Sequence, residues 1–131
     1  MVTLICGLPN SGKTTYSRKY DNVIHLDDVG HKVFDAVKES NDDVVVEGIF
    51  ILRSTRTKLL KAYNGDGKRI CVWLDVSPEE CERRENRNRA KYAIWNCHSV
   101  FEPSTLDEGW DEIIIIRGDD NVECVNRKRQ T

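Results

Sequence analysis

A glycine-framed segment near the start of the chain restricts the fold more than any other feature of the sequence. Residues 7–14 read Gly-Leu-Pro-Asn-Ser-Gly-Lys-Thr, which matches the pattern G-x-x-x-x-G-K-[ST] of the phosphate-binding P-loop. Glycine allows the tight turn that brings main-chain N–H groups close to an anion. The lysine of this pattern reaches the β- and γ-phosphates, and the threonine hydroxyl is placed to bind Mg²⁺. The motif therefore predicts a nucleoside triphosphate site.

The residues around this segment predict a strand before it and a helix after it. Residues 2–6 form a short apolar run, typical of a buried parallel strand, and residues 13–20 contain no helix breaker. The alternative is a glycine-rich turn that binds nothing, but the order of strand, loop and helix is the one that phosphate binding requires. The residues expected to contact the nucleotide are Leu8, Asn10, Ser11, Gly12, Lys13, Thr14 and Thr15. Among them, Lys13 is also expected to act in catalysis and Thr14 to bind metal.

Length and composition predict a single domain over residues 1–131, because 39% of the residues are hydrophobic and 32% are charged. The formal net charge of −2 provides no global positive field that would draw the chain onto nucleic acid. Five cysteines include no C-x-x-C pair, and Cys6 and Cys71 lie in apolar runs, where cysteine packs as a small hydrophobe. Without a signal peptide or membrane segment in the sequence, we expect a cytoplasmic protein with no membrane partner.

Apolar, strand-like runs alternate with helical patterns along the chain. We expect strands at residues 2–6, 23–26, 43–47, 69–75 and 112–116. We expect helices at residues 13–20, 29–40 and 54–63, and another that begins at residue 77. Strands that alternate with helices and are apolar on both faces predict a three-layer α/β fold, with a parallel sheet between helices. The polar tail at about 117–131 is expected to be partly disordered or to lie along the surface.

Acidic residues follow two of the predicted strands, at the sheet edge where such folds bind ligands. Asp27 and Asp28 follow the second strand, and Glu47 ends the third. We interpret Asp27 as the base that accepts a proton from an acceptor hydroxyl, and both aspartates as acceptor contacts. The alternative is that they cap the next helix. Glu47 is predicted to bind magnesium or its water; the alternative is a solvated acid at a strand end.

An arginine-rich segment follows the fourth strand. Residues 82–91 read Glu-Arg-Arg-Glu-Asn-Arg-Asn-Arg-Ala-Lys and fall within a predicted lid at about 82–100. Arginines on such a lid can close over a nucleotide and stabilise charge in the transition state. We therefore expect Arg83, Arg84 and Arg87 to contact the nucleotide, with Arg87 as a catalytic residue. The alternative is a solvated helix face.

Further side chains have two interpretations each. Tyr92, Trp95 and Phe101 are placed to stack on nucleobases or, alternatively, to anchor the lid on the core. Arg53 and Arg56 are candidate contacts for phosphates of an acceptor.

Four segments carry a resemblance to a known family. They are the P-loop at 7–14, the pair Asp27-Asp28, residues 74–81 (Leu-Asp-Val-Ser-Pro-Glu-Glu-Cys) and residues 101–113 (Phe-Glu-Pro-Ser-Thr-Leu-Asp-Glu-Gly-Trp-Asp-Glu-Ile). The last segment is similar to F-E-x-P-x-x-x-E-G-[FW]-D-E-I. Together they resemble the P-loop kinases of the polynucleotide 5′-hydroxyl kinase family, including bacteriophage enzymes. The resemblance covers most of the chain and extends only to the kinase domain.

The resemblance implies a P-loop fold with five parallel strands in the order 2-3-1-4-5, and ATP and Mg²⁺ as cofactors. It also implies Asp27 as the base and lid arginines among Arg83, Arg84 and Arg87. Two segments depart from the family pattern. An arginine often lies three residues after the base, where this chain has Gly30, and D-x-T-N often follows the third strand, where this chain has Glu-Gly-Ile-Phe at 47–50. Both segments help to hold the acceptor in the family.

Three functions are therefore open at the level of the sequence. The first is an ATP-dependent kinase that transfers the γ-phosphate to the 5′-hydroxyl of DNA or RNA. The second is a kinase of a nucleoside, a modified base or another small hydroxyl compound, favoured by the apolar run at 48–52. The third is a nucleotide-binding module or NTPase without a hydroxyl acceptor. The oligomeric state is not predicted.

Overall fold

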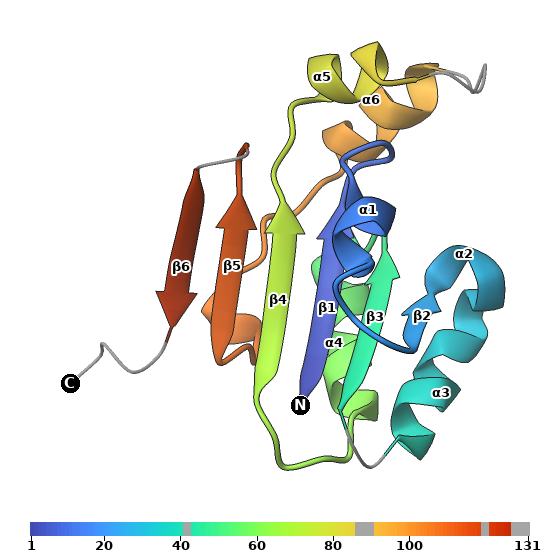
Figure 1. Cartoon of the computed structure of the whole chain (residues 1–131), viewed down its shortest axis with the longest axis vertical. Helices are drawn as coiled ribbons and strands as arrows, with labels where there is room; N and C mark the ends of the chain where they lie inside the picture. The colour runs from blue at the N-terminus through green and yellow to red at the C-terminus, as the bar shows by residue number, and fades with distance from the viewer. Residues whose placement is uncertain (41–42, 86–90, 119–120, 127–131) are drawn as a thin grey trace.

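The chain folds around one six-stranded sheet in the order β2-β3-β1-β4-β5-β6, as the computed structural model in Figure 1 shows. The structure describes residues 1–40, 43–85, 91–118 and 121–126. The strands are β1 (Val2–Gly7), β2 (Val23–His25), β3 (Val44–Gly48), β4 (Arg69–Leu74), β5 (Glu112–Ile116) and β6 (Val122–Asn126). The first five are parallel to one another, and β6 is antiparallel to β5.

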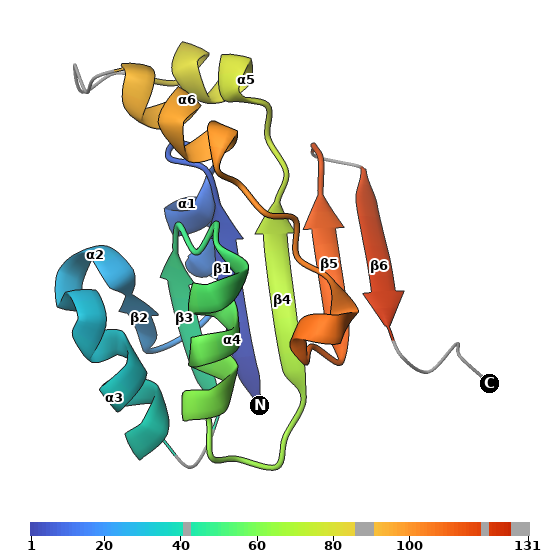
Figure 2. The same ribbon diagram turned by 180° about the vertical axis from the view of Figure 1, so that it is seen from behind.

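Helices cover both faces of this sheet. They are α1 (Lys13–Ser17), α2 (Leu26–Val29), α3 (Val33–Glu39), α4 (Arg53–Ala62), α5 (Pro78–Arg83) and α6 (Lys91–Ser99), with short 3-10 helices η1 (Gly30–Lys32) and η2 (Leu106–Glu108). In Figures 1 and 2, α1 lies on one face and α4 on the other, while α5 and α6 lie beyond the carboxyl ends of the strands. Within the described residues, no helix has the length and apolar character needed to cross a bilayer.

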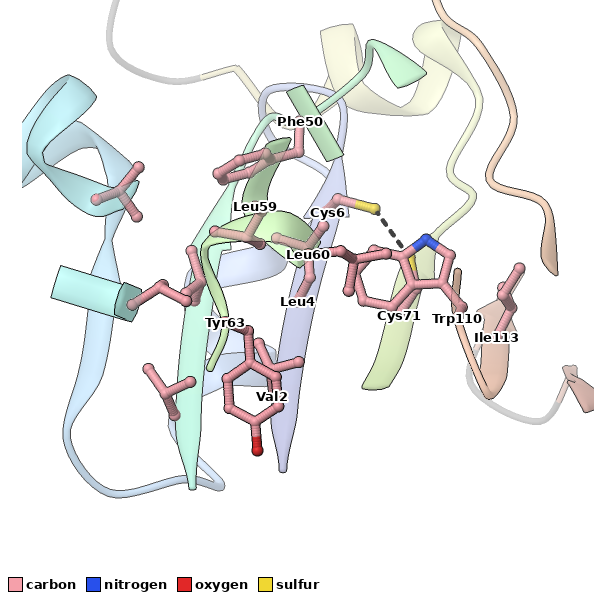
Figure 3. Packing of buried hydrophobic residues seen from close by; sticks show 14 of the residues in the cluster. Val2, Leu4, Cys6, Phe50, Leu59, Leu60, Tyr63, Cys71, Trp110 and Ile113 are labelled. Atoms are coloured by element: carbon pink, nitrogen blue, oxygen red, sulfur yellow. Dashed lines mark hydrogen bonds between the residues drawn. The ribbon is translucent and has the colours of Figure 1, made fainter. Parts of the chain in front are cut away.

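Alternate residues of the central strand β1 build the two halves of the core. Val2, Leu4 and Cys6 pack in a cluster with side chains of α3 and α4, part of which Figure 3 shows. Ile5 faces the other side, in a cluster that includes Tyr16 of α1. Because successive strand residues point to opposite faces, a strand buried on both sides is mostly apolar. The three-layer arrangement expected from the sequence is therefore observed.

The sheet has one strand more than expected. The first five strands follow the expected order 2-3-1-4-5, but residues 122–126 add an antiparallel edge strand, so the prediction of a five-stranded, wholly parallel sheet is wrong. Arg117 N donates to Asn121 O at 2.9 Å and closes the turn into β6. Pairing supplies partners for the open edge of β5, an apolar strand whose N–H and C=O groups would otherwise face solvent. The polar tail is thus a strand over 122–126, and residues 127–131 lie outside the described part.

Two predicted helices are shorter or broken. The α-helix expected at 13–20 ends at Ser17. Residues 18–20 form turns after it, in which each N–H donates to the carbonyl three residues earlier. The helix expected at 29–40 is interrupted, because Gly30 adopts φ 59°, a left-handed value that L side chains rarely take. The break ends α2 at Val29 and separates it from α3. Helix α2 begins directly after β2, and its first residue, Leu26, lies against Gly48 at the carboxyl end of β3.

Candidate functional site

A cavity of about 480 Å³ opens at the carboxyl ends of β1 and β3. Its lining residues are Pro9, Asn10, Gly12, Lys13, Thr14, Thr15, Asp27, Glu47, Gly48, Ile49 and Arg84. We call this the strand-end cavity. Four segments far apart in the sequence meet there: the loop after β1, the first turn of α2, the end of β3 and the end of α5. The parallel register, which pairs Cys6 with Gly48, explains why the first and third of these segments lie side by side.

The loop between β1 and α1 turns sharply through left-handed backbone. Asn10 has φ 66° and Gly12 has φ 99°, while Ser11 N donates to Leu8 O at 3.1 Å. The Asn10 side chain donates to Cys81 O at 3.2 Å and to the Glu85 carboxylate at 3.1 Å, which ties the loop to α5. The backbone thus has the compact form that the motif predicts.

Lys13 begins α1 and folds back over this loop. Its ammonium donates to Leu8 O at 2.8 Å, and only 8% of the residue is exposed. Burial lowers the pKa of Lys13, while the nearby carboxylates of Glu47 and Asp27 act to raise it. Its charge is therefore held in a partly desolvated place, where an anion gains more from it than in water.

Two further loop positions bear on phosphate binding. Ser11 Oγ is buried and has no hydrogen-bond partner among the described residues. An unpaired buried hydroxyl is unusual, and a ligand oxygen at the loop would satisfy it. The side chains of Thr14 and Thr15 are exposed at the cavity. Leu8, also expected to contact nucleotide, is buried, and its carbonyl is the group that accepts from Lys13.

Glu47 is a buried carboxylate at the end of β3. Its side chain is 8% exposed, and Oε1 lies 2.6 Å from His25 Nδ1. Sequence reasoning assigned His25 no role, because only the parallel register of β2 and β3, which pairs the two residues, brings them together.

The oxygen groups at the cavity fit a magnesium ion. Thr14 and Glu47 line the same space, and hydroxyl and carboxylate oxygens are ligands that Mg²⁺ prefers. Over the described residues, no cluster of three or more His, Cys, Asp or Glu side chains is arranged to hold a metal. Such an ion would take its remaining ligands from phosphate and water, as Mg²⁺ commonly does beside nucleotides.

The two aspartates lie in the first turn of α2 rather than at the end of β2. His25 occupies the N-cap position, so the alternative interpretation of Asp27 and Asp28 as capping residues is wrong. Both are exposed, but Asp27 lines the cavity and Asp28 does not belong to the lining. The structure therefore separates two adjacent acids that the sequence could not distinguish.

The arginines of the predicted lid fall in different places. Arg84 lines the cavity and donates from Nη1 to Asn10 O at 3.3 Å. Arg83 is exposed, pairs with Glu80 at 2.6 Å and is not a lining residue. Arg87 lies outside the described residues. Trp95 donates to the Glu82 carboxylate at 2.7 Å, which anchors α6 to α5.

The two arginines proposed to contact acceptor phosphates belong to another network. Arg56 is fully buried and donates from Nε to Glu108 Oε1 at 2.8 Å. The interpretation of Arg56 as a substrate contact is therefore wrong, since a side chain enclosed in the core cannot meet an acceptor. Arg53 is partly exposed, pairs with Asp107 at 2.8 Å and does not line the cavity. Sequence reasoning missed Glu108 because its partner is 52 residues away.

Solved structures match the chain, although no family model and no curated protein matches its sequence. The crystal structure of Chaetomium thermophilum Kti12 in complex with ADP-AlF3 has a TM-score of 0.69 and 17% identity, and the match covers 92% of this chain and 91% of that one. A gluconokinase from Sinorhizobium meliloti 1021 has a TM-score of 0.62 and 16% identity, with 90% and 83% covered. At these identities the likeness shows the fold alone, which this chain shares with Kti12 and with that gluconokinase.

Proposed function

We propose that the chain is an ATP-dependent phosphotransferase that moves the γ-phosphate to a hydroxyl group of an acceptor. The observation that carries this proposal is the strand-end cavity, which a P-loop with a buried lysine lines together with two carboxylates, Glu47 from β3 and Asp27 from α2. Phosphoryl transfer needs these parts: a phosphate cradle, a cation, metal ligands and a base near the acceptor. The fold shared with a gluconokinase, and with Kti12 bound to ADP-AlF3, supports the same class of reaction.

On the donor side, main-chain N–H groups of residues 10–15 would surround the phosphates. Lys13 moves from its contact with Leu8 O to the β- and γ-phosphates. The Thr14 hydroxyl and the Glu47 carboxylate would hold Mg²⁺, which would neutralise charge on the phosphate oxygens. Arg84, which already contacts the loop, stabilises charge on the transferred group. Arg83 and Arg87 remain predicted contributors from a lid at about 82–100.

On the acceptor side, Asp27 accepts the proton of the attacking hydroxyl. Asp27 is exposed and contributes to the lining from α2, in the same cavity as the P-loop residues. A positioned carboxylate in this role accelerates transfer by roughly 10²–10⁴-fold. Asp28 stays a proposed acceptor contact from the same helical turn.

The charge of the cavity favours a small, uncharged hydroxyl compound as acceptor. Among the described lining residues, the basic side chains are Lys13 and Arg84, and both lie at the P-loop. The remaining charged lining residues are Asp27 and Glu47, and the apolar Ile49 lies beside them in the lining. A 5′ end of DNA or RNA brings its own phosphates near Asp27, the proposed base, and like charges repel there.

A 5′-hydroxyl of DNA or RNA is the second candidate acceptor. It rests on the similarity of residues 101–113 and of the pair Asp27-Asp28 to the polynucleotide 5′-hydroxyl kinase family. An NTPase or a nucleotide-binding module is the candidate of another class. A module that only binds nucleotide needs no base beside the γ-phosphate, so it leaves the position of Asp27 without an explanation, whereas an NTPase would use such a group on water.

Acceptor-dependent release of ADP separates these functions. Purified protein is given Mg²⁺-ATP with uncharged nucleosides and polyols, with matched nucleoside 3′-phosphates, or with a 5′-hydroxyl oligonucleotide. We expect the uncharged compounds to raise ADP release, and the 3′-phosphate to slow it for the same 5′-hydroxyl. Faster release with the 3′-phosphate or the oligonucleotide would favour the second candidate. ADP release that no hydroxyl compound raises would favour the NTPase.

A further inference from the structure

One histidine beside the strand-end cavity has no part in the mechanism above. His25 is the last residue of β2, and Nδ1 lies 2.6 Å from Glu47 Oε1. The two residues are paired in the register of parallel strands β2 and β3, so their side chains leave the sheet beside each other. The contact therefore follows from the backbone arrangement of the sheet.

The contact uses one oxygen of Glu47 and leaves the other open. Among the described residues, no hydrogen-bond partner contacts Oε2, while Glu47 as a whole lines the cavity. The terminal torsion of a glutamate is soft, so an unheld carboxylate adopts many orientations. Lys13 offers a competing partner, since its charge interacts with that of Glu47. A fixed Oε1 prevents the carboxylate from turning away from the cavity.

His25 also joins the two acidic groups of the proposed mechanism. It occupies the N-cap position of α2, and Asp27 lies in the first turn of that helix. Its side chain contacts Glu47 while its backbone sets the start of the helix that carries Asp27. Of its side chain, 32% is exposed, against 8% for Glu47, so the imidazole closes the outer side of the pair.

We propose that His25 is a positioning residue, which holds Glu47 Oε1 so that Oε2 is presented to the divalent cation of the nucleotide complex. This inference rests on the proposed function, because it requires Glu47 to meet that cation. Hydrogen-bonded partners of metal-binding carboxylates typically change metal affinity by 10–100-fold when they are removed. Loss of the His25 contact should therefore change the affinity for the metal and leave the affinity for nucleotide without metal unchanged.

The experiment compares variants that keep or lose a donor at the place of Nδ1. In His25→Asn the side-chain amide nitrogen takes that place, whereas in His25→Gln it lies further out, near the place of Nε2. Both variants are polar and suit a partly exposed site, so both are expected to fold. His25→Leu removes the donor altogether, and His31→Leu is the matched control on an exposed histidine outside the cavity lining.

Affinity for Mn²⁺ is measured by electron paramagnetic resonance in the presence of ADP, and affinity for ADP without metal by calorimetry. We expect His25→Leu and His25→Gln to weaken Mn²⁺ binding by roughly tenfold or more. We expect His25→Asn and His31→Leu to stay within about threefold of the parent protein, with metal-free ADP affinity unchanged in all of them.

Two results would overturn the positioning role. One is Mn²⁺ affinity in His25→Gln equal to that in His25→Asn. The other is an equal loss of metal-free ADP affinity, which would indicate a general effect on the fold. A parent protein that binds ADP neither with nor without metal would instead reject the proposed function itself, so the two failures are distinguishable.

Discussion

Two buried carboxylates, Glu108 and Glu47, each pair with a nitrogen-containing side chain, but they differ in how many of their oxygens have partners. Glu108 uses both oxygens: Oε1 accepts from Arg56 and from Trp110 at 3.0 Å, and Oε2 accepts from Arg56 at 2.9 Å. Glu47 uses one oxygen, toward His25, and lines the strand-end cavity. A buried acid whose acceptor sites are all filled stabilises the fold, whereas one with an open oxygen can bind a ligand. The sequence alone shows Glu47 at the end of a predicted strand and Glu108 outside the predicted strands and helices, and it gives no partner for either.

The Arg56–Glu108 network also holds the chain segment that leaves β3 next to the cavity. Arg56 donates to Phe50 O at 2.9 Å and to Glu102 O at 2.7 Å. Phe50 has φ 32°, a conformation that costs energy in a non-glycine residue and persists where contacts hold it. It follows Glu47 by three residues, so this network shapes the segment that leaves β3. The segment at 101–113 thus has a structural role, because its Glu102 carbonyl and Glu108 carboxylate hold Arg56.

The largest expected effect belongs to the cavity and concerns turnover. We expect Asp27→Asn to slow transfer to the acceptor by roughly 10²–10⁴-fold, because the amide cannot accept the hydroxyl proton. Its nucleotide affinity by calorimetry should stay close to that of the parent, and its free energy of unfolding should change by less than about 0.5 kcal/mol, since the residue is exposed. Asp35→Asn, at an exposed acid of α3 outside the cavity lining, is the control and should keep most of the turnover. Equal turnover in Asp27→Asn and the parent would show that Asp27 is not the base that accepts the hydroxyl proton.

The next effect belongs to the buried network and concerns stability. We expect Arg56→Met to lower the free energy of unfolding by roughly 3–5 kcal/mol, because Glu108 is left as an unpaired buried charge. Urea denaturation measures the loss. The matched control is Arg53→Met in the same helix, where the ion pair with Asp107 is partly exposed and the expected loss is below about 1 kcal/mol. Equal losses in both variants would show that burial does not distinguish the two pairs.

Lys13→Met tests whether the buried lysine serves the cavity or the core. We expect turnover to fall by roughly 10²–10³-fold, the usual cost of one lost charge-stabilising donor. The free energy of unfolding should fall little, because burial disfavours the charged ammonium of Lys13 and lowers its pKa. ADP release and urea denaturation are measured on the same preparation. A large loss of stability with little loss of turnover would place Lys13 with Arg56, as part of the core.

The smallest expected effect lies at the exposed end of α5. Hydrogen bonds from Arg83 and then Arg84 lower the pKa of Glu80 from 4.5 to about 2. A carboxylate with a lowered pKa in the folded state adds stability above its unfolded pKa and loses it as the pH falls. Glu80→Gln should therefore be less stable than the parent at pH 6, and the difference should shrink between pH 4.5 and about 2. A pH-independent difference would argue against this cause.

The parallel part of the fold could be predicted because its signals are local. Apolar runs flanked by turns marked β1, β3, β4 and β5 to within two residues, and their alternation with helices predicted the layers. Strand β6 was missed because Val122, Glu123 and Cys124 are exposed, so no apolar pattern marks them. Its pairing depends on the open edge of β5, which is a property of the assembled sheet.

The residues of the candidate site likewise divide into those that a local motif predicts and those whose roles depend on distant partners. The P-loop is a continuous motif whose function depends on spacing within one turn, and it could be read directly from residues 7–14. The roles of Arg56 and His25 depend on partners 52 and 22 residues away. Asp27 and Asp28 differ only in which of them faces the cavity, and the short helix α2 decides that.

The sequence by itself determined the P-loop motif, the sequential order of strands and helices, and the sheet edge at which the strand-end cavity lies. These follow from local backbone preferences and from hydrophobic periodicity, which act over a few residues. Only the tertiary structure decided which charged groups are enclosed in the core and which are open to the cavity. The reason is that burial and hydrogen-bond satisfaction depend on strand register and helix packing, so Arg56 belongs to the core and Glu47 keeps an oxygen for a ligand.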